Sequence, residues 1–439
     1  MNLKESFYKT YRLIIGSIAF YPTIIAVVFF IVAMLMMAFE YQGFAGDIKS
    51  RISFLLVNSQ EDARLILGTL VGSIISLMVF SFSMVMLVLN RATATLSPRV
   101  IPGLITDKSN QVVLGCYLGS IIYCLVLIIN IQSIDDTNGI PSLGILAAMI
   151  FGITCLGFFI YFIHTISISI QVDNILDRIL KQTMTEMDKS ELNPGDDNIE
   201  FPSTESWQTL TAPESGYLKQ VQTKRLINFC NAHDLCLKLI NPIGFFHVQG
   251  IPYLHVNKSV SAELEESIHS MFVFYPEEHL EDHYRFGINQ ISEIAVKALS
   301  PGINDPGTAI KGIDMLSILL IKNMNMREKL AIRDNDGKTH LYFAQVKFSE
   351  LLYNTFTPIR AYGKTDAVVM FNLLEGIKNM IYADQASLNL TTLTNYANSI
   401  LDSCSSINNI MDMEKIDTMV EAINELVSTE LSLKTLSKR

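Results

Sequence analysis

The stretch "LILGTLVGSIISLMVFSFSMVMLVL", residues Leu65–Leu89, decides the fold class, because no charged side chain interrupts it. A helix needs about 20 predominantly apolar residues to cross roughly 30 Å of hydrocarbon, and this run is long enough. One similar run precedes it and two follow it, at roughly Leu13–Ala38, Val112–Ile131 and Ser142–Ile170. The sequence therefore predicts four transmembrane helices.

The first of these runs follows three basic residues, as the core of a secretory signal would. It is too long for such a core, however, and no small-residue cleavage site follows it, so we expect it to be a retained anchor. Positive charges gather at the N-terminus, in the loop between the second and third runs and after Ile170, namely at Lys4, Lys9, Arg12, Arg91, Arg99, Lys108, Arg178 and Lys181. The opposite side has only Lys49, Arg51 and Arg64. This bias predicts a multi-pass protein of the bacterial inner membrane with both termini in the cytoplasm.

Composition agrees with a membrane protein and excludes several other classes. Of 439 residues, 49% are hydrophobic and only 17% charged, which departs from the average soluble domain. The net charge of -10 gives no general attraction to nucleic acid, so no such partner is expected. The six cysteines, at positions 116, 124, 155, 230, 236 and 404, show no C-x-x-C spacing, so neither a zinc site nor a disulfide framework is indicated.

The fold class predicted is a mainly α membrane protein, with four transmembrane helices followed by a cytoplasmic α+β domain. Residues 1–182 form the membrane domain, and the acidic, Pro- and Ser-containing residues 183–214 form a polar linker. Residues 215–260 form a small β-rich module, since short runs end at glycines and one helix is expected near Thr223–Ala232. Residues 261–439 form a mainly helical domain, with a hairpin around Asp336-Gly337.

Four segments occur in a recognisable order: "LSPRVI" (96–101), "SGYLKQV" (215–221), "DHYRFGINQISEIAVKALSPGINDPGTAI" (282–310) and "IRAYGKTDAVV" (359–369). Together they resemble the bacterial predicted membrane proteins of domain-of-unknown-function family twenty-two fifty-four. The resemblance spans nearly the whole chain and implies four N-terminal membrane helices with a cytoplasmic C-terminal domain, but no activity. One departure is Glu277-Glu278, where the family usually has an Arg-Thr pair shortly before Asp282.

The corner "SPGINDP" between two apolar helices has two readings. Pro301-Gly302 ends the first helix, and Asp305 is suited to cap the second, with Pro306 at its first position. This structural reading leaves Asn304 least explained. The other reading is a ligand site, because the start of a helix can hold an anion. The ligand or hinge candidates are Asp282, Ser300, Asn304, Asp305, Thr308 and Arg360.

Catalytic, metal and cofactor signals are weak. In "HLEDH" (279–283) two histidines lie one helical turn apart, but a solvated helix face explains them better than a metal site. No nucleophile elbow, Walker motif or dinucleotide fingerprint is present, so we expect no cofactor, no metal and no enzyme activity.

Polar residues recur every seven positions along the second membrane run. Ser76, Ser83, Asn90 and Ser97 form this polar stripe, Ser73 joins it, and Gly68 and Gly72 lie on nearly the same face. One reading is a tight helix–helix seam, which Gly115 and Gly119 in the third run also favour. The other is a water-filled path lined by hydroxyls. Apart from the weakly acidic Tyr and Cys, His164 in the fourth run is the only ionisable residue deep in any of the four runs, and it is a further candidate, although its place toward the cytoplasmic end also fits a side chain that reaches the interface.

Two functions are consistent with these patterns. The first is an ion channel or transport protein with a cytoplasmic assembly or gating domain. Because four helices are too few to enclose a wide path, this reading requires a homo-oligomer in the lipid bilayer. The second is a membrane-anchored sensor or scaffold that binds a ligand or partner at the SPGINDP corner.

Overall fold

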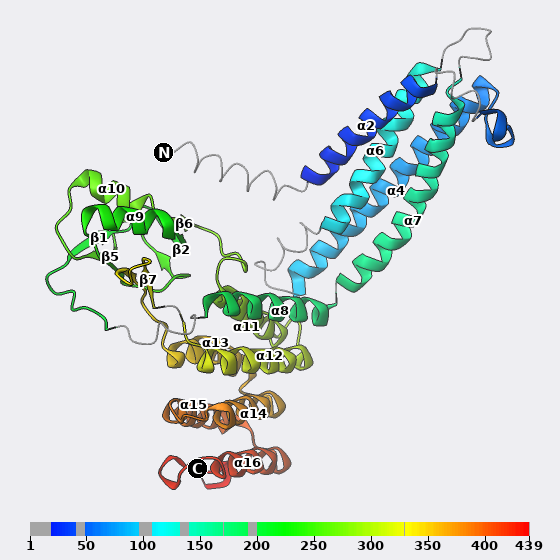
Figure 1. Ribbon diagram of the computed structural model, residues 1–439. Coiled ribbons are helices and arrows are strands. Elements are labelled where there is room, and N and C mark those ends of the chain that lie inside the picture. The colour runs from blue at the N-terminus through cyan, green and yellow to red at the C-terminus, as the bar shows by residue number, and fades with distance from the viewer. Residues whose placement is uncertain are drawn as a thin grey trace. The chain divides into compact units, whose positions relative to one another are not determined.

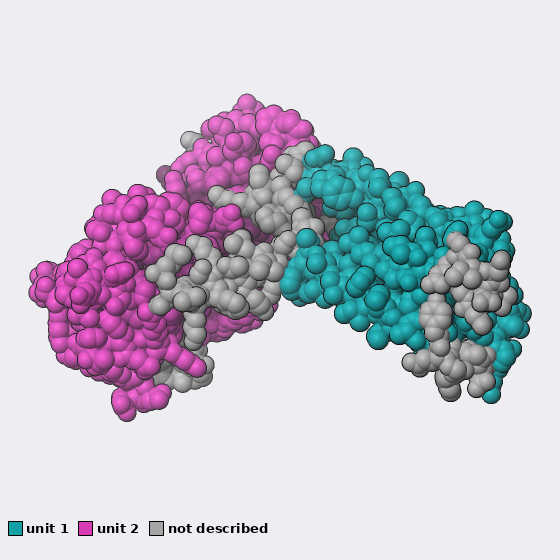
Figure 2. All heavy atoms as spheres, turned by 90° about the horizontal axis from the view of Figure 1, so that it is seen from above, with its two compact units in different colours: residues 1–94, 100–171 teal, residues 95–99, 172–439 magenta. Residues whose placement is uncertain are grey.

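The computed structural model describes residues 19–40, 49–95, 108–131, 140–169, 171–191, 200–328 and 330–438. The chain divides into two compact units (Figure 2). Unit 1 comprises residues 1–94 and 100–171, and unit 2 comprises residues 95–99 and 172–439.

Unit 1 contains four long helices, each apolar and long enough to cross a membrane (Figure 1). They are α2 (Phe20–Glu40), α4 (Gln60–Thr95), α6 (Lys108–Asn130) and α7 (Ser142–Ser169), with a short 3-10 turn, η1 (Ser53–Leu55), before α4. Large apolar side chains such as Val27, Leu65 and Ile153 point outward and are more than half exposed. A surface of this kind is suited to lipid rather than to water. The predicted fold class is thus confirmed in its membrane part.

Glycines on α6 allow it to pack tightly against α2. A Cβ atom added at Gly115 would lie 2.7 Å from Cδ1 of Ile25, and one at Gly119 would lie 2.7 Å from the Phe29 ring. Real Cβ atoms do not approach so closely, so each position requires glycine or a shift of its neighbour. The tight packing expected at these two glycines is therefore present.

A buried carboxylate links the ends of α2 and α7. Glu40 accepts hydrogen bonds from the backbone N–H groups of Leu143 (3.2 Å) and Gly144 (3.3 Å), and it pairs with Lys49 at 2.7 Å. The first N–H groups of a helix have no partner within the helix, and the dipole there attracts negative charge. Glu40 thus caps α7 and offsets the cost of its own burial.

The first helix that lies wholly in unit 2 is α8 (Val172–Ser190), and two small sheets with one shared core follow it. The five-stranded sheet has the order β1 (Gln208–Thr211), β5 (Pro252–Val256), β3 (Leu237–Leu239), β8 (Thr339–Tyr342), β7 (Ala331–Arg333). The three-stranded sheet has the order β4 (Phe246–His247), β2 (Gly216–Val221), β6 (Phe272–Tyr275). Helices α9 (Thr223–His233) and α10 (Ala262–His269) contribute Leu226 and Ile268 to the core.

The remaining helices of unit 2 follow one another in layers (Figure 1). They are α11 (Tyr284–Ala298), α12 (Pro306–Asn325), α13 (Phe348–Gly363), α14 (Ala367–Ala383), α15 (Leu390–Ser403) and α16 (Ile410–Asn424), with short 3-10 turns η4 (Cys404–Ser406), η5 (Thr429–Leu431) and η6 (Leu436–Lys438). Helix α11 packs against both α8 and α12, α12 against α14, and α14 against α16. Each helix is amphipathic, as its sequence period predicts.

One packed core continues across the predicted domain boundaries at residues 214 and 260, since it contains Leu210, Leu218, Val256 and Ile268. Boundary 182 falls inside α8, whose residues Ile175, Ile179 and Met187 are buried. Helix α8 and strand β1 both lie partly or wholly in the predicted linker 183–214. The two sheets also contain β6, β7 and β8, which come after residue 260. Polar composition indicated a linker, but one buried stripe on a helix is enough to fix it in a fold.

Candidate functional site

The polar stripe of α4 lies on its outward side. Within unit 1, Ser73, Ser76, Ser83 and Asn90 are all exposed, whereas Met78 and Val85 pack into a core cluster with α6 and α7. Ser97 lies outside the described residues. The stripe therefore does not form a seam among the described helices of unit 1.

Two hydroxyls of the stripe are bonded within α4 itself. Ser76 Oγ donates to the carbonyl oxygen of Gly72 at 3.0 Å, and Ser83 Oγ donates to that of Val79 at 2.9 Å. Among the described atoms, a Cβ added at Gly68 or Gly72 would meet nothing within 4 Å. Serines bonded in this way tolerate lipid or a neighbouring helix, and small residues let a second helix approach closely.

The inward side of α4 carries a polar residue that the sequence reasoning missed. Ser81 is fully buried, as are Leu67 and, almost completely, Ile74, which precede it at seven-residue intervals. The same interior contains Tyr117 on α6 and a contact from Cys155 Sγ to Ser120 Oγ at 3.4 Å. Seven-residue spacing could not have singled out Ser81, because the outward serines Ser76 and Ser83 share that spacing. His164, in contrast, is exposed on α7 and does not join this set.

The SPGINDP corner is a capped turn between α11 and α12. Asp305 is the N-cap of α12: its Oδ1 accepts from the Thr308 N–H at 3.1 Å, and its Oδ2 accepts from Thr308 Oγ1 at 2.7 Å. Pro306 occupies the first turn of the helix. Because a carboxylate already fills the start of this helix, a second anion would meet like charge there.

The backbone of the corner accounts for Asn304 and Ser300. Asn304 has a φ of 49°, in the left-handed region that Asn adopts more readily than most residues, and its N–H donates to the Ser300 carbonyl oxygen at 2.9 Å. Ser300 Oγ donates to the Lys297 carbonyl oxygen at 2.6 Å. These bonds turn the chain from α11 into α12 without a ligand. A role of these residues in ligand binding stays a prediction.

Arg360 makes its contacts with α15. Its guanidinium donates to Ser399 Oγ and lies 5.5 Å from the centre of the Tyr396 ring. The end of α13 does approach the corner, since a Cβ added at Gly363 would lie 3.4 Å from Cδ1 of Leu299. The family segment around Arg360 thus contacts the corner through Gly363.

The other candidate, Asp282, belongs to a buried ionic cluster at the start of α11. Asp282 pairs with Lys219 at 2.6 Å, and the two side chains are only 9% and 2% exposed. The ammonium group also lies 5.0 Å from the centre of the Tyr275 ring. The register of β2 against β6 shifts between Leu218 and Gln220, so Lys219 sits at a β-bulge that re-aims its side chain inward.

His283 and Arg285 complete this cluster. His283 is the N-cap of α11, and its Nδ1 accepts from the Arg285 N–H at 3.2 Å. Burial, with the nearby Arg285 charge, lowers the pKa of His283 to about 3, so the imidazole stays neutral. The Arg285 guanidinium is itself buried and lies 4.3 Å from the centre of the Phe245 ring. No sequence signal singles out Lys219 or Arg285, because both have polar neighbours, Gln220 after Lys219 and Asp282-His283 before Arg285.

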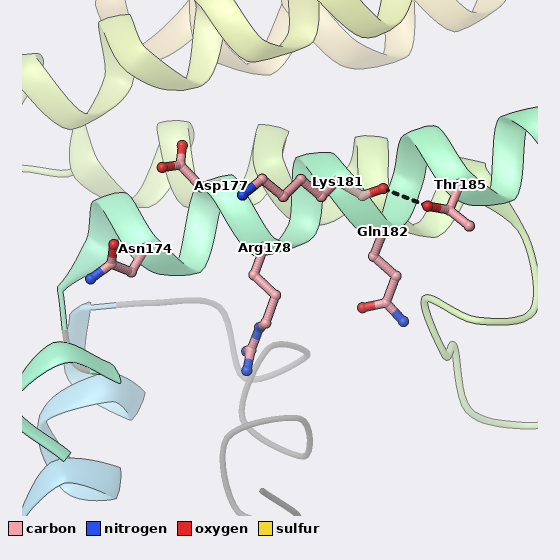
Figure 3. Close-up of a pocket in the computed structure, with 6 residues that line it drawn as sticks. All are labelled: Asn174, Asp177, Arg178, Lys181, Gln182 and Thr185. Atoms are coloured by element: carbon pink, nitrogen blue, oxygen red, sulfur yellow. Dashed lines mark hydrogen bonds between the residues drawn. The ribbon is translucent and has the colours of Figure 1, made fainter. Parts of the chain in front are cut away.

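A shallow cavity of about 520 Å³ lies along the polar face of α8 (Figure 3). Its lining comes from α8 alone, namely Asn174, Asp177, Arg178, Lys181, Gln182 and Thr185. In Figure 3 the Lys181 ammonium points toward Asp177 along the helix. Lys311 of α12 binds Asp173 at 2.9 Å and Asp177 at 3.7 Å, which fixes α8 on α12. One helix face supplies no converging groups, so this cavity is a solvated surface of unit 2.

No group of three or more potential metal ligands occurs within the described residue ranges. His279 lies 3.6 Å from Glu277 and is partly exposed, while His283 uses its Nδ1 in capping. The two histidines of "HLEDH" therefore have different roles.

The chain is similar to a known protein family and to proteins of two mycobacteria. The profile of the family described as "Predicted membrane protein (DUF2254)" matches residues 16–379. The uncharacterized protein MT1328 of Mycobacterium tuberculosis is 26% identical over 331 residues, which cover 72% of this chain and 63% of that protein. The uncharacterized protein Mb1321c of Mycobacterium bovis is 25% identical over the same shares. The chain thus spans less than two thirds of the length of these curated relatives. No solved structure matches the chain.

Proposed function

The chain belongs to the DUF2254 family of predicted membrane proteins, and from this premise we propose that it is an oligomeric transport protein. Several copies assemble through the outer face of α4, around a shared polar path for ions or small solutes. The observation that carries this proposal is the exposure of Ser73, Ser76, Ser83 and Asn90 on the outside of unit 1.

A path through the middle of one copy has no support, because the interior of unit 1 is packed. Leu67, Tyr117 and Phe162 are fully buried there, and core clusters join α4 to α6 and α7. The bonds of Ser76 and Ser83 to their own helix make contact with lipid tolerable, but polar faces in a bilayer usually point at protein or water. Identical copies related by rotation bring identical faces together, so a closed ring places the stripes around one axis.

Unit 2 would serve assembly or gating. Helix α8 begins at Val172, directly after α7 ends at Ser169, so the chain connects the fourth span to the helical layers. Helix α8 is held against α11 by a close contact, because a Cβ added at Gly287 would lie 1.8 Å from Thr183 Oγ1. A displacement of α11 would therefore carry α8 with it. The alternative, a sensor or scaffold binding at the corner, has less support because Asp305 already occupies the start of α12.

Single cysteines test this proposal. In a chain whose six native cysteines are replaced, Ser76→Cys, Ser83→Cys and Asn90→Cys should react with a small polar thiol reagent in intact membranes and form disulfides between copies on oxidation. Met78→Cys and Val85→Cys point into the core and should do neither, since thiolates form poorly in apolar surroundings. Reagent should also stop ion flux through vesicles that contain the stripe variants.

The outcomes separate the parts of the proposal. If disulfides form but the cysteines do not react with the thiol reagent and no ion flux is seen, the α4 faces form a dry contact between copies. The proposed assembly is then correct, and the proposed polar path is not. Neither disulfides nor reaction at any stripe position means that α4 faces lipid, and the proposal fails.

We also infer that the protein lies in the bacterial inner membrane with both termini in the cytoplasm. The support is the distribution of basic residues, which favours the cytoplasmic side. Reporter fusions after Asp136, which lies outside the described residues, should be extracytoplasmic, and fusions after Lys181 and Arg439 cytoplasmic. An extracytoplasmic C-terminus would contradict this orientation. It would also place Cys230 and Cys236 in an oxidising compartment.

A further inference from the structure

Strands β3 and β8 are the one parallel pair among the strands of the described residues, and a crevice lies beyond their shared end. Lys238 and Tyr342 are the last residues paired in this ladder. A cavity of about 330 Å³ follows, lined on one side by Leu239 and Ile240 and on the other by Phe343, Ala344 and Gln345. In open α/β sheets, ligands bind in the crevice outside the carboxyl ends of the strands, and the end of this parallel pair leaves a crevice in the same position.

The segment before β1 covers this crevice. Phe201 and Thr204 line it, and the Phe201 and Tyr342 rings lie 5.7 Å apart. Lys238 holds the segment: its Nζ donates to the Pro202 carbonyl oxygen at 3.3 Å and lies 5.6 Å from the centre of the Phe201 ring. The crevice thus has a cation at one wall and aromatic rings beside it.

His255 adds a neutral polar group to the same wall. It lies directly opposite Lys238 in the β3–β5 ladder, and its Nδ1 is 3.1 Å from Thr209 Oγ1. Burial, with the Lys238 charge, lowers the pKa of His255, so the ring carries no charge at neutral pH. The lining residues, Phe201, Thr204, Lys238, Leu239, Ile240, His255, Phe343, Ala344 and Gln345, include no Asp or Glu. The charge of the crevice is therefore positive.

We propose that this crevice binds a small aromatic anion, with its carboxylate or phosphate at Lys238 and its ring against Phe201 and Phe343. The volume is at the lower end of the range for small-molecule sites, about 300–1,000 Å³. Lys238 would exchange its weak bond to a backbone carbonyl for a stronger one to an anion. This site is distinct from the α4 face, and it stands or falls independently of the transport proposal.

The chain carries its own reporter for this test. Trp207 is the single tryptophan, and its backbone N–H donates to the carbonyl oxygen of the crevice residue Thr204 at 3.1 Å. Its fluorescence is followed in the purified full-length protein while AMP or benzoate, two aromatic anions of different size, is added. Adenosine and benzyl alcohol are the uncharged counterparts, and inorganic phosphate is the anion without a ring.

At least one aromatic anion should change the fluorescence saturably, and its uncharged counterpart and phosphate should bind about tenfold more weakly or worse. Lys238→Gln should weaken binding by about tenfold or more, whereas Lys238→Arg should keep most of it. Lys224→Gln is the matched control, because it removes one exposed charge from α9, which packs on the opposite face of the sheet.

Circular dichroism confirms that each variant keeps its fold. The proposal is overturned if neither AMP nor benzoate binds saturably at millimolar concentration. It is equally overturned if Lys238→Gln and Lys224→Gln bind the anion as well as the native chain does. In either case Lys238 only fastens the segment before β1.

Discussion

The outer face of α4 in unit 1 and the start of α11 in unit 2 place their polar side chains in opposite ways. On α4 of unit 1 the polar residues Ser76 and Ser83 point outward, while Met78 and Val85 pack into an apolar core cluster on the other side of the helix. At the start of α11 in unit 2 the charged residues Lys219, Asp282 and Arg285 point inward. An outward polar side chain in a bilayer can find its partner on another molecule. A buried charge must find its partner within the same fold.

The largest effect is expected from breaking the buried pair. Asp282→Leu leaves the Lys219 ammonium buried without its partner, and the free energy of unfolding should fall by about 3–5 kcal/mol. The double variant Lys219→Met/Asp282→Leu should recover most of this loss, because two apolar groups need no pairing. Denaturant unfolding of the full chain in detergent, followed by circular dichroism, measures both.

The matched comparison is Lys258→Met, which removes one end of an exposed pair with Asp234 (2.5 Å) and should cost little. Equal losses in the exposed and buried variants would show that Lys219 and Asp282 are not desolvated in solution. The contrast between the two units would then be lost.

How far the sequence predicts this molecule depends on which property is at issue. The four spans, the hairpin with Gly337 at a φ of 82° and the inward face of α11 follow from hydrophobic period and turn chemistry alone. The direction of a polar side chain does not, because it depends on neighbours far away in the chain. Strand alternation gives no sign of the bulge that turns Lys219 inward. Similarly, a seven-residue repeat fits both the outward Ser76 and the inward Ser81.

A second prediction concerns the neutral imidazole beside this buried pair. The pKa of His283 in the folded protein is about 3, below its ordinary value of 6.5, so the unfolded chain binds the proton more readily. Stability contributed by neutral His283 should therefore be lost as the pH falls from about 6.5 toward 3, by at most about 1.4 kcal/mol per pH unit. His283→Asn keeps a capping side chain but cannot titrate, so its unfolding free energy should fall less between pH 6.5 and 5. If both chains lose stability in parallel, the imidazole is not desolvated in the native fold.

The smallest effect on stability is expected at the SPGINDP corner, because the Asp305 carboxylate is exposed there. Asp305 contributes mainly two short-range bonds to Thr308, so Asp305→Ala should lower the free energy of unfolding by about 1 kcal/mol. Asp305→Ser retains an oxygen for the Thr308 N–H and should cost much less, because capping needs an acceptor rather than a charge. Thermal unfolding of the three chains measures the order. A loss for the Ser variant as large as for Ala would mean that the negative charge itself matters, and the corner would then be a candidate for binding a cation or a basic partner.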